Sequence, residues 1–320
     1  MAATAAVSAE REKRRAAQSS VAAAILLTLI KIIVGVTTGS LGILAEAAHS
    51  ALDLIAALAT FFAVRLSDKP ADEQHRYGHG KIENFSALVE TVLLLITAAW
   101  IIYEAIQRLF FESAQVDASV WAFVVMGLSV AVDYAVSRAL SRAAKAHHSQ
   151  ALEADALHFS TDIWSSSVVI VGLIGVKLGE WFPALAFLGR ADAIAAIVVA
   201  IIVVFVSLQM GRRTVLALLD TAPEGLPDEI KAAVEAVPGV VDCHRVRVRQ
   251  SGPYLFVDAH VALVDNPPLS VAHDVVLKIE DAIHQIAPRA DIVVHADPEA
   301  MVTPRLIRED AAEELRYTPD

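Results

Sequence analysis

Residues 43–64 read ILAEAAHSALDLIAALATFFAV, and residues 151–172 read ALEADALHFSTDIWSSSVVIVG. Both stretches are mainly apolar, and each carries a histidine four residues before an aspartate: His49 and Asp53, then His158 and Asp162. In a helix this spacing places both side chains on one face, one turn apart. Ionisable groups at membrane depth are costly unless they face a partner or a water-filled cavity. We therefore expect two membrane helices that meet across these side chains.

Six apolar segments account for most of the first 220 residues, in a chain of 320 residues that is 56% hydrophobic. Each is about 20 residues or longer, enough to cross a hydrocarbon core, and backbone groups in lipid must be satisfied within a helix. We expect an α-helical membrane domain of six transmembrane helices. The segments are residues 20–38, 41–66, 85–110, 120–140, 151–178 and 191–216.

Basic residues indicate the orientation of these segments. They are concentrated before the first segment, between the second and third, between the fourth and fifth, and after the sixth. The other connections are poor in lysine and arginine, with Lys177 and Arg190 as a minor exception. Lysine and arginine stay on the cytoplasmic side, so we expect both termini there. The basic N-terminus followed by an apolar run is interpreted as a retained first span and not as a cleaved signal peptide.

The remainder of the chain has the pattern of a soluble αββαβ module. Helical periodicity and alternation predict a helix, two strands joined by a turn, a second helix and a last strand. This order predicts a C-terminal α+β ferredoxin-like (αββαβ) cytoplasmic domain with a split βαβ unit. The expected elements are residues 227–237, 242–250, 254–264, 270–286 and 291–295. The expected parts are an N-terminal cytoplasmic tail (1–16), the transport domain (17–221), a metal-binding dimerisation domain (222–300) and a flexible C-terminal tail (301–320).

Composition excludes several classes of protein. The single cysteine, Cys243, excludes an intramolecular disulfide and a cysteine-based zinc ribbon. The net charge of −11 argues against nucleic acid as a partner.

The two His/Asp pairs together offer four nitrogen and oxygen ligands, which suffice for a tetrahedral divalent metal. One intramembrane histidine could simply donate to a neighbouring carbonyl, but that explanation does not account for two identical pairs. Imidazole and carboxylate suit Zn²⁺ and, less selectively, Fe²⁺, Co²⁺, Cd²⁺ or Mn²⁺. No thiolate is offered, so Cu⁺ is not expected.

A second candidate site lies in the loop between the second and third segments. Asp72, His75 and His79 could hold a metal together, and Gly78 and Gly80 allow a tight backbone path. The alternative is a solvated loop whose histidines have no function.

A third candidate site lies in the C-terminal module. His244 and His260 fall on two strands expected to be adjacent, and alternation puts His295 and Asp297 on one face of the last strand. With His273 they could build a metal site on the sheet or at a dimer interface. The alternative is ordinary surface histidine.

Further charged residues lie within the apolar segments. Lys31, Glu46 and Asp133 could pair with one another, line an aqueous cavity or extend toward the membrane surface. Asp155, one turn before His158, could attract cations or cap its helix.

The combined pattern resembles the cation diffusion facilitator family, and within it the bacterial YiiP-like efflux branch, over residues 17–298. The resemblance implies a homodimeric divalent metal/proton antiporter in a bacterial-type inner (plasma) membrane, and not an enzyme. It further implies Zn²⁺ both as substrate and as a structural or regulatory ligand. The residues it assigns are His49, Asp53, His158 and Asp162 as the transport site; Asp72, His75 and His79 as the loop site; His244, His260, His273, His295 and Asp297 as the cytoplasmic site; and Lys81 with Asp220 as a dimer lock.

One position departs from that branch, which often has aspartate where this chain has His49. A quartet of two histidines and two aspartates resembles the zinc-preferring members, although residues 45–54 also resemble members associated with iron or cobalt. Three other classes fit less well. An intramembrane metallo-enzyme needs an open metal position and a catalytic base, which this pattern does not offer. A metal sensor would be expected to lack one or more of the four ligands. A channel is disfavoured because four strong ligands would bind the metal too tightly for rapid conduction.

Overall fold

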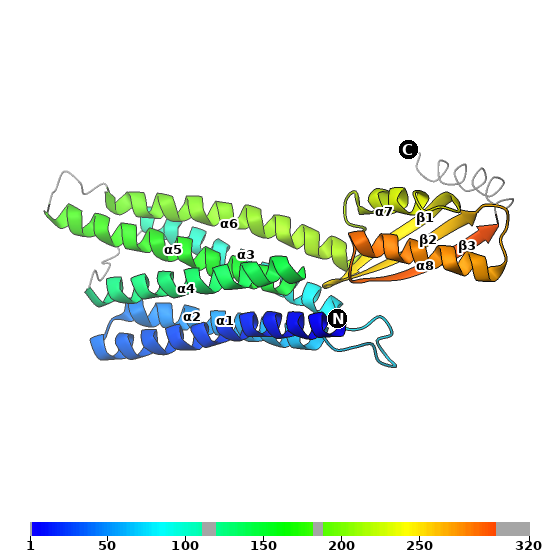
Figure 1. The fold of residues 1–320 in the computed structure, drawn as a ribbon. Helices are drawn as coiled ribbons and strands as arrows, with labels where there is room; N and C mark the ends of the chain where they lie inside the picture. The colour runs from blue at the N-terminus through cyan, green and yellow to red at the C-terminus, as the bar shows by residue number, and fades with distance from the viewer. Residues whose placement is uncertain (1, 111–119, 182–187, 299–320) are drawn as a thin grey trace. The chain divides into compact units, whose positions relative to one another are not determined.

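The computed structural model describes residues 2–110, 120–181 and 188–298 (Figure 1). The chain divides into two compact units, Met1–Val215 and Leu216–Asp320. The expected C-terminal tail, residues 301–320, lies outside the described residues. Six helices form the bundle of the first unit: α1 (Ala2–Thr38), α2 (Leu41–Ser67), α3 (Lys81–Phe110), α4 (Val120–His147), α5 (Gln150–Trp181) and α6 (Leu188–Leu218).

These helices coincide with the six predicted segments, and the predicted fold class is confirmed. Among the described residues, five helices are long and apolar enough to cross a membrane, and they lie in α1, α2, α3, α4 and α6. The part of α5 that the structure describes is not in that set. One boundary differs clearly: α1 begins at Ala2, so much of the expected N-terminal tail is helical.

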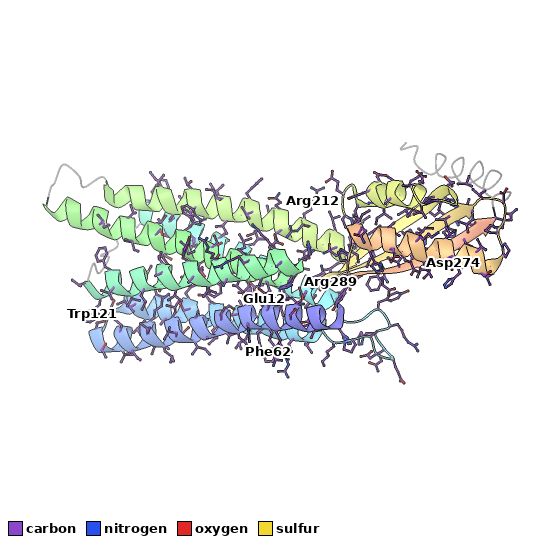
Figure 2. All side chains as sticks on the ribbon, in the orientation of Figure 1. Glu12, Phe62, Trp121, Arg212, Asp274 and Arg289 are labelled. Carbon is purple, nitrogen blue, oxygen red and sulfur yellow. The ribbon has the colours of Figure 1, made fainter. Side chains whose placement is uncertain are left out.

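Polarity in the bundle is inverted relative to a soluble protein. Large apolar side chains such as Ile33, Phe62 and Trp121 are exposed on its outside, and Figure 2 shows the last two there. Polar and charged side chains such as Glu90 and His158 are buried inside. This arrangement suits helices whose outer surface meets lipid and whose interior holds polar groups together.

Helix packing brings the two His/Asp helices together. The α2 helix contacts α5, and α3 contacts both of them. Ser40 caps the start of α2 by accepting a hydrogen bond from the backbone N–H of Ile43. The α6 helix approaches α3 closely at Gly211, where a Cβ atom would lie 2.9 Å from Thr91 Cγ2. A larger side chain at this position would separate the two helices.

A buried charge network ties α1 to the ends of three other helices. The Lys13 ammonium donates to Glu83 Oε1 at 3.1 Å and also to Asp68, the residue that ends α2. Glu83, in the first turn of α3, also accepts from Ser67 at 2.9 Å and from Ser149, just before α5. Lys13 and Glu83 are both almost completely buried. Burying charges is tolerable here because each has charged and hydrogen-bonding partners.

The second unit is an αββαβ module. It comprises α7 (Leu226–Glu235), β1 (Val240–Ser251), β2 (Tyr254–Leu263), α8 (Leu269–Ile286) and β3 (Ala290–Pro298). The sheet order is β1-β2-β3, with β1 antiparallel and β3 parallel to β2. The expected split βαβ unit is wrong in this detail. Because β1 pairs with one edge of β2 and β3 with the other, the two parallel strands are direct neighbours.

The core of this unit lies on one face of the sheet. Ile230 of α7 and Ile279 of α8 are fully buried in one cluster with Val257 and Val261 of β2. Side chains alternate along a strand, so His260, between the two valines, lies on the opposite face. The helices therefore leave a polar face of the sheet available for ligands.

Candidate metal sites

The four predicted side chains of the bundle converge, and we refer to them as the quartet: His49, Asp53, His158 and Asp162. The Nε2 atom of His158 lies 3.0 Å from Asp53 Oδ1 and 3.7 Å from Asp162 Oδ2. The Nε2 atom of His49 lies 3.9 Å from Asp53 Oδ1 and 3.9 Å from Asp162 Oδ1. The His158 side chain is only 5% exposed, whereas that of His49 is 38% exposed.

These separations fit a small tetrahedral cation. Zinc bonds to nitrogen and oxygen of about 2.0–2.1 Å require neighbouring ligand atoms about 3.3 Å apart. The measured separations lie on both sides of that value, and Asp53, His158 and Asp162 already place one ligand atom each within 4.8 Å of the others. His49, the fourth member, is not within 4.8 Å of all three, so it has to move inward to complete a tetrahedral set.

A small cavity of about 30 Å³ adjoins the quartet, enough for one or two water-sized groups. His49, Asp53 and Asp162 line it together with Lys31 and Asp133. The cavity also accounts for two other charged residues of the apolar segments, Lys31 and Glu46. The Lys31 ammonium donates to Ser50 Oγ at 2.7 Å and to Glu46 Oε2 at 3.3 Å, so the charges pair with one another beside the cavity.

Glu90 is a carboxylate at this site that the sequence reasoning missed. It lies on α3, is 1% exposed, and its Oε2 atom is 3.8 Å from His158 Nδ1. Its Oε1 atom accepts a hydrogen bond from Thr60 Oγ1 at 2.8 Å. An ionisable residue inside the predicted segment 85–110 was the signal that could have identified it. Asp155 is also buried, and its carboxylate has no hydrogen-bond partner among the described residues.

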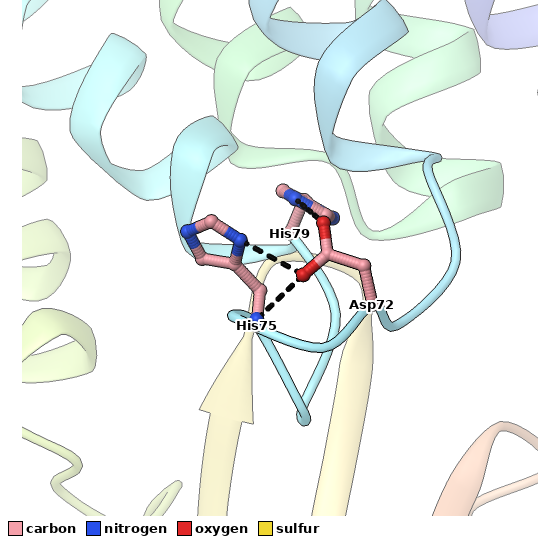
Figure 3. A group of neighbouring side chains, drawn as sticks. All are labelled: Asp72, His75 and His79. Carbon is pink, nitrogen blue, oxygen red and sulfur yellow. Dashed lines mark hydrogen bonds and ion pairs between the residues drawn. The ribbon is translucent and has the colours of Figure 1, made fainter.

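The three residues of the loop site also meet, as Figure 3 shows. Asp72 places Oδ1 3.2 Å from His75 Nδ1 and Oδ2 3.3 Å from His79 Nε2. The backbone N–H of His75 donates to Asp72 Oδ1 at 2.6 Å, and this bond is the main reason why the pKa of Asp72 lies below its ordinary value. Gly78 adopts a positive φ of 76°, which permits the tight turn. The loop thus offers three ligands, two of them largely exposed.

In the second unit, three histidines lie side by side across the sheet. His260 pairs in register with His244 of β1 and with His295 of β3. Asp297 joins them: its Oδ2 atom is 3.1 Å from His260 Nδ1 and 3.7 Å from His244 Nε2, and its Oδ1 atom is 3.3 Å from His295 Nε2. Asp242, which was not predicted, lies 2.8 Å from His244 Nδ1. We call the three histidines and Asp297 the tail cluster.

His273 does not join the tail cluster within this chain. It is exposed on α8, which packs on the opposite face of the sheet. Lys81 begins α3 and Asp220 follows α6. They belong to different units, and their proposed pairing stays a prediction.

Comparisons with known proteins cover nearly the whole chain. Residues 17–219 match the family model of the cation efflux transmembrane domain, and residues 222–299 match that of the cytoplasmic domain of cation efflux proteins. The chain is 35% identical to proteins named cation-efflux pump FieF from Klebsiella pneumoniae, over 90% of this chain and 93% of that one. The same holds for Salmonella arizonae, at 35% over 92% and 95%.

Two solved structures of C-terminal domains are each similar to about a quarter of the chain. The metal-bound C-terminal domain of the CzcD transporter from Thermotoga maritima is 27% identical, with a TM-score of 0.23, over 24% of this chain and 91% of that one. The nickel form of a variant of the MamM C-terminal domain is 22% identical, with a TM-score of 0.23, over 24% and 98%.

Proposed function

This chain belongs to the cation diffusion facilitator family of multi-pass cation efflux transporters, and from that premise we propose that its quartet carries Zn²⁺ out of the cytoplasm in exchange for protons. It is a transporter of divalent cations and not an enzyme. The observation that carries the proposal is the convergence of four ligands from α2 and α5 inside the bundle, beside a cavity of about 30 Å³.

Proton coupling follows from the ligands themselves. An imidazole binds metal only through a nitrogen that carries no proton, so metal and protons compete for His49 and His158. A site that opens alternately to the two sides of the membrane would load metal on the cytoplasmic side. It would exchange that metal for protons on the outer side.

The proposal gives the other two sites accessory roles. The family match supports a dimerisation domain in the second unit, and we propose a homodimer locked by Lys81 and Asp220. We further propose that cytoplasmic metal regulates transport by binding at the loop site and the tail cluster, where it changes the conformational equilibrium of the membrane domain. Both termini are proposed to be cytoplasmic, in a bacterial-type inner membrane, with domain boundaries at residues 17–221 and 222–300.

Inverted membrane vesicles test antiport, because in them the cytoplasmic side faces out. We expect Zn²⁺ uptake only when the lumen is more acidic than the medium. Collapsing that gradient with a proton/potassium exchanger should stop the uptake. Undiminished uptake after collapse would show that protons are not the counter-substrate.

Metal identity depends most directly on His49. Proteoliposomes offered Zn²⁺, Fe²⁺, Co²⁺, Cd²⁺ and Mn²⁺ should transport Zn²⁺ fastest, because two imidazoles and two carboxylates suit it best. His49→Asp replaces a nitrogen ligand by a harder oxygen ligand and should shift the preference away from zinc. An order unchanged by His49→Asp, or one led by iron, cobalt, cadmium or manganese in the unaltered protein, would contradict the zinc assignment.

A further inference from the structure

One nitrogen of the quartet faces away from the other ligands and toward a buried carboxylate. His158 presents Nε2 to Asp53 and Asp162, and its Nδ1 atom lies 3.8 Å from Glu90 Oε2. Among the described residues, neither that Nδ1 atom nor Glu90 Oε2 has a hydrogen-bond partner. The side chains of His158 and Glu90 are 5% and 1% exposed, so water does not readily replace a partner.

Glu90 is held in place for this contact. Its second oxygen, Oε1, accepts a hydrogen bond from Thr60 Oγ1 at 2.8 Å, and Thr60 is itself fully buried on α2. This bond links α3 to the helix that carries His49 and Asp53. The free oxygen of Glu90 is therefore fixed on the His158 side.

Metal binding would require a hydrogen-bond acceptor at Nδ1 of His158, where Glu90 lies. When Nε2 of a neutral histidine donates its lone pair to a cation, the ring proton must reside on Nδ1. Metal-bound histidines donate that proton to a carboxylate, a carbonyl or water, which fixes the tautomer and the ring orientation. A buried Nδ1–H without an acceptor is costly. Closing the 3.8 Å separation to a hydrogen bond of about 2.8–3.0 Å needs a shift of roughly 1 Å.

We propose that Glu90 is a positioning residue of the transport site: it accepts the Nδ1–H of His158 when Nε2 of His158 binds the transported cation. The inference rests on the proposed function of the quartet. Glu90 acts through His158 and does not touch the cation. By holding the productive tautomer it strengthens cation binding on the side of the site formed by α5.

Asp155 offers a matched control. It is a second buried carboxylate near the site, but it does not lie within 4.0 Å of a His158 nitrogen in the described structure, whereas Asp53, Glu90 and Asp162 do. A general effect of removing buried charge should therefore appear equally in Asp155→Asn and at Glu90.

The test measures Zn²⁺ affinity of the full-length protein in a parent variant, Asp72→Ala with Asp297→Ala, that disables the loop site and the tail cluster. We expect Glu90→Leu to weaken binding about 10- to 100-fold. Glu90→Gln should recover most of that loss, since its amide oxygen still accepts an N–H. Asp155→Asn should stay within about threefold of the parent, because it removes no acceptor of His158.

Nitrogen NMR of His158 gives a readout that does not depend on any variant at Glu90. In the zinc-loaded parent we expect a protonated Nδ1 with the shift of a donor to a carboxylate. A bare Nε2–H tautomer would overturn the proposal. A loss smaller than tenfold in Glu90→Leu, or an equal loss in Glu90→Gln or Asp155→Asn, would also overturn it. If the parent shows no zinc binding that Asp162→Ala removes, the quartet itself is not the transport site and the proposed function fails first.

Discussion

The quartet and the tail cluster use the same two kinds of ligand but differ in burial. The His158 side chain is 5% exposed, whereas that of His295 is 62% exposed. Water can therefore replace the exposed His295 of the tail cluster with little penalty, whereas Asp297 is only 12% exposed. Water reaches the quartet only at His49 and the adjoining cavity of about 30 Å³, so we expect the loss of a buried carboxylate there to leave other charges unpaired. We therefore expect the quartet to be more sensitive than the tail cluster to the loss of a ligand.

The units around the two sites differ in the same way. The bundle places apolar side chains such as Phe205 outside and polar ones inside, whereas the second unit buries Ile230 and Ile283 in an ordinary apolar core. Water can therefore more readily replace a lost polar partner at the sheet surface than between the helices. Variants that compare the two regions should show unequal effects.

The largest difference is expected in transport. Asp162→Ala removes a charged ligand of the quartet and should reduce zinc transport in proteoliposomes to background. Asp297→Ala, the matched change in the tail cluster, should weaken metal binding by the second unit but leave measurable transport. Full activity in Asp162→Ala would show that the quartet is not the transport site.

A second large effect is expected from the buried network of the bundle. Lys13→Met leaves Glu83 and Asp68 without their cation, and breaking a buried ion pair costs about 3–5 kcal/mol. Thermal unfolding of the purified protein should show this loss. Arg14→Met removes the exposed neighbouring charge and should leave the unfolding temperature nearly unchanged. Equal stability of the two variants would contradict the role given to Lys13.

A third effect concerns the apolar core of the second unit. Cys243 is fully buried, and burial raises the pKa of its thiol to about 11. Maleimide labelling at pH 8 should be slower in the folded protein than in the urea-unfolded chain by at least about 100-fold, because the thiolate is the reacting form. Since the folded pKa exceeds the ordinary value of 9.0, the associated stability is present below pH 9.0 and is lost as pH rises through about 11. Rapid labelling of the folded chain would argue against this core.

The smallest effect is expected in the exposed loop. The pKa of Asp72 is lowered from 3.8 chiefly by the backbone N–H of His75. Because the pKa of Asp72 is lower in the folded loop, the ionised carboxylate stabilises the loop at pH values above the ordinary pKa. This stabilisation is lost as the pH falls through the pKa of the folded state. The protection factors of the loop amides in the metal-free protein, which correct for the intrinsic pH dependence of exchange, should therefore be constant from neutral pH to pH 5 and decrease in stronger acid. Asp72→Asn should remove that acid dependence, and an unchanged acid response would contradict it.

The sequence predicted features that depend on spacing within one element. The four-residue interval between His49 and Asp53 sufficed to place them on one helix face, and strand alternation sufficed to align His295 with Asp297. Some features that depend on packing between elements were missed, although the meeting of the two His/Asp helices was predicted. Whether Glu90 faces His158 or lipid depends on how α3 rotates against α5, and sequence periodicity does not specify that rotation.

Three further features that the sequence does not specify have the same origin. Lys13 was interpreted as part of a cytoplasmic tail, because nothing nearby in the sequence shows that Glu83, 70 residues later, is its partner. His273 was grouped with the tail histidines. Because α8 covers the other face of the sheet, its part in a metal site stays a prediction. The order of the three strands likewise depends on which edge of β2 is free.

The most direct test of the quartet is to locate the bound ion. Zinc-loaded, full-length protein in lipid nanodiscs, studied by cryo-electron microscopy with an Asp162→Ala control, should show density among Asp53, His158 and Asp162, with the His49 side chain drawn toward it. The control should lose that density and keep density at the tail cluster. Zinc density at the tail cluster but none in the bundle, in an otherwise well-defined unaltered protein, would contradict the account.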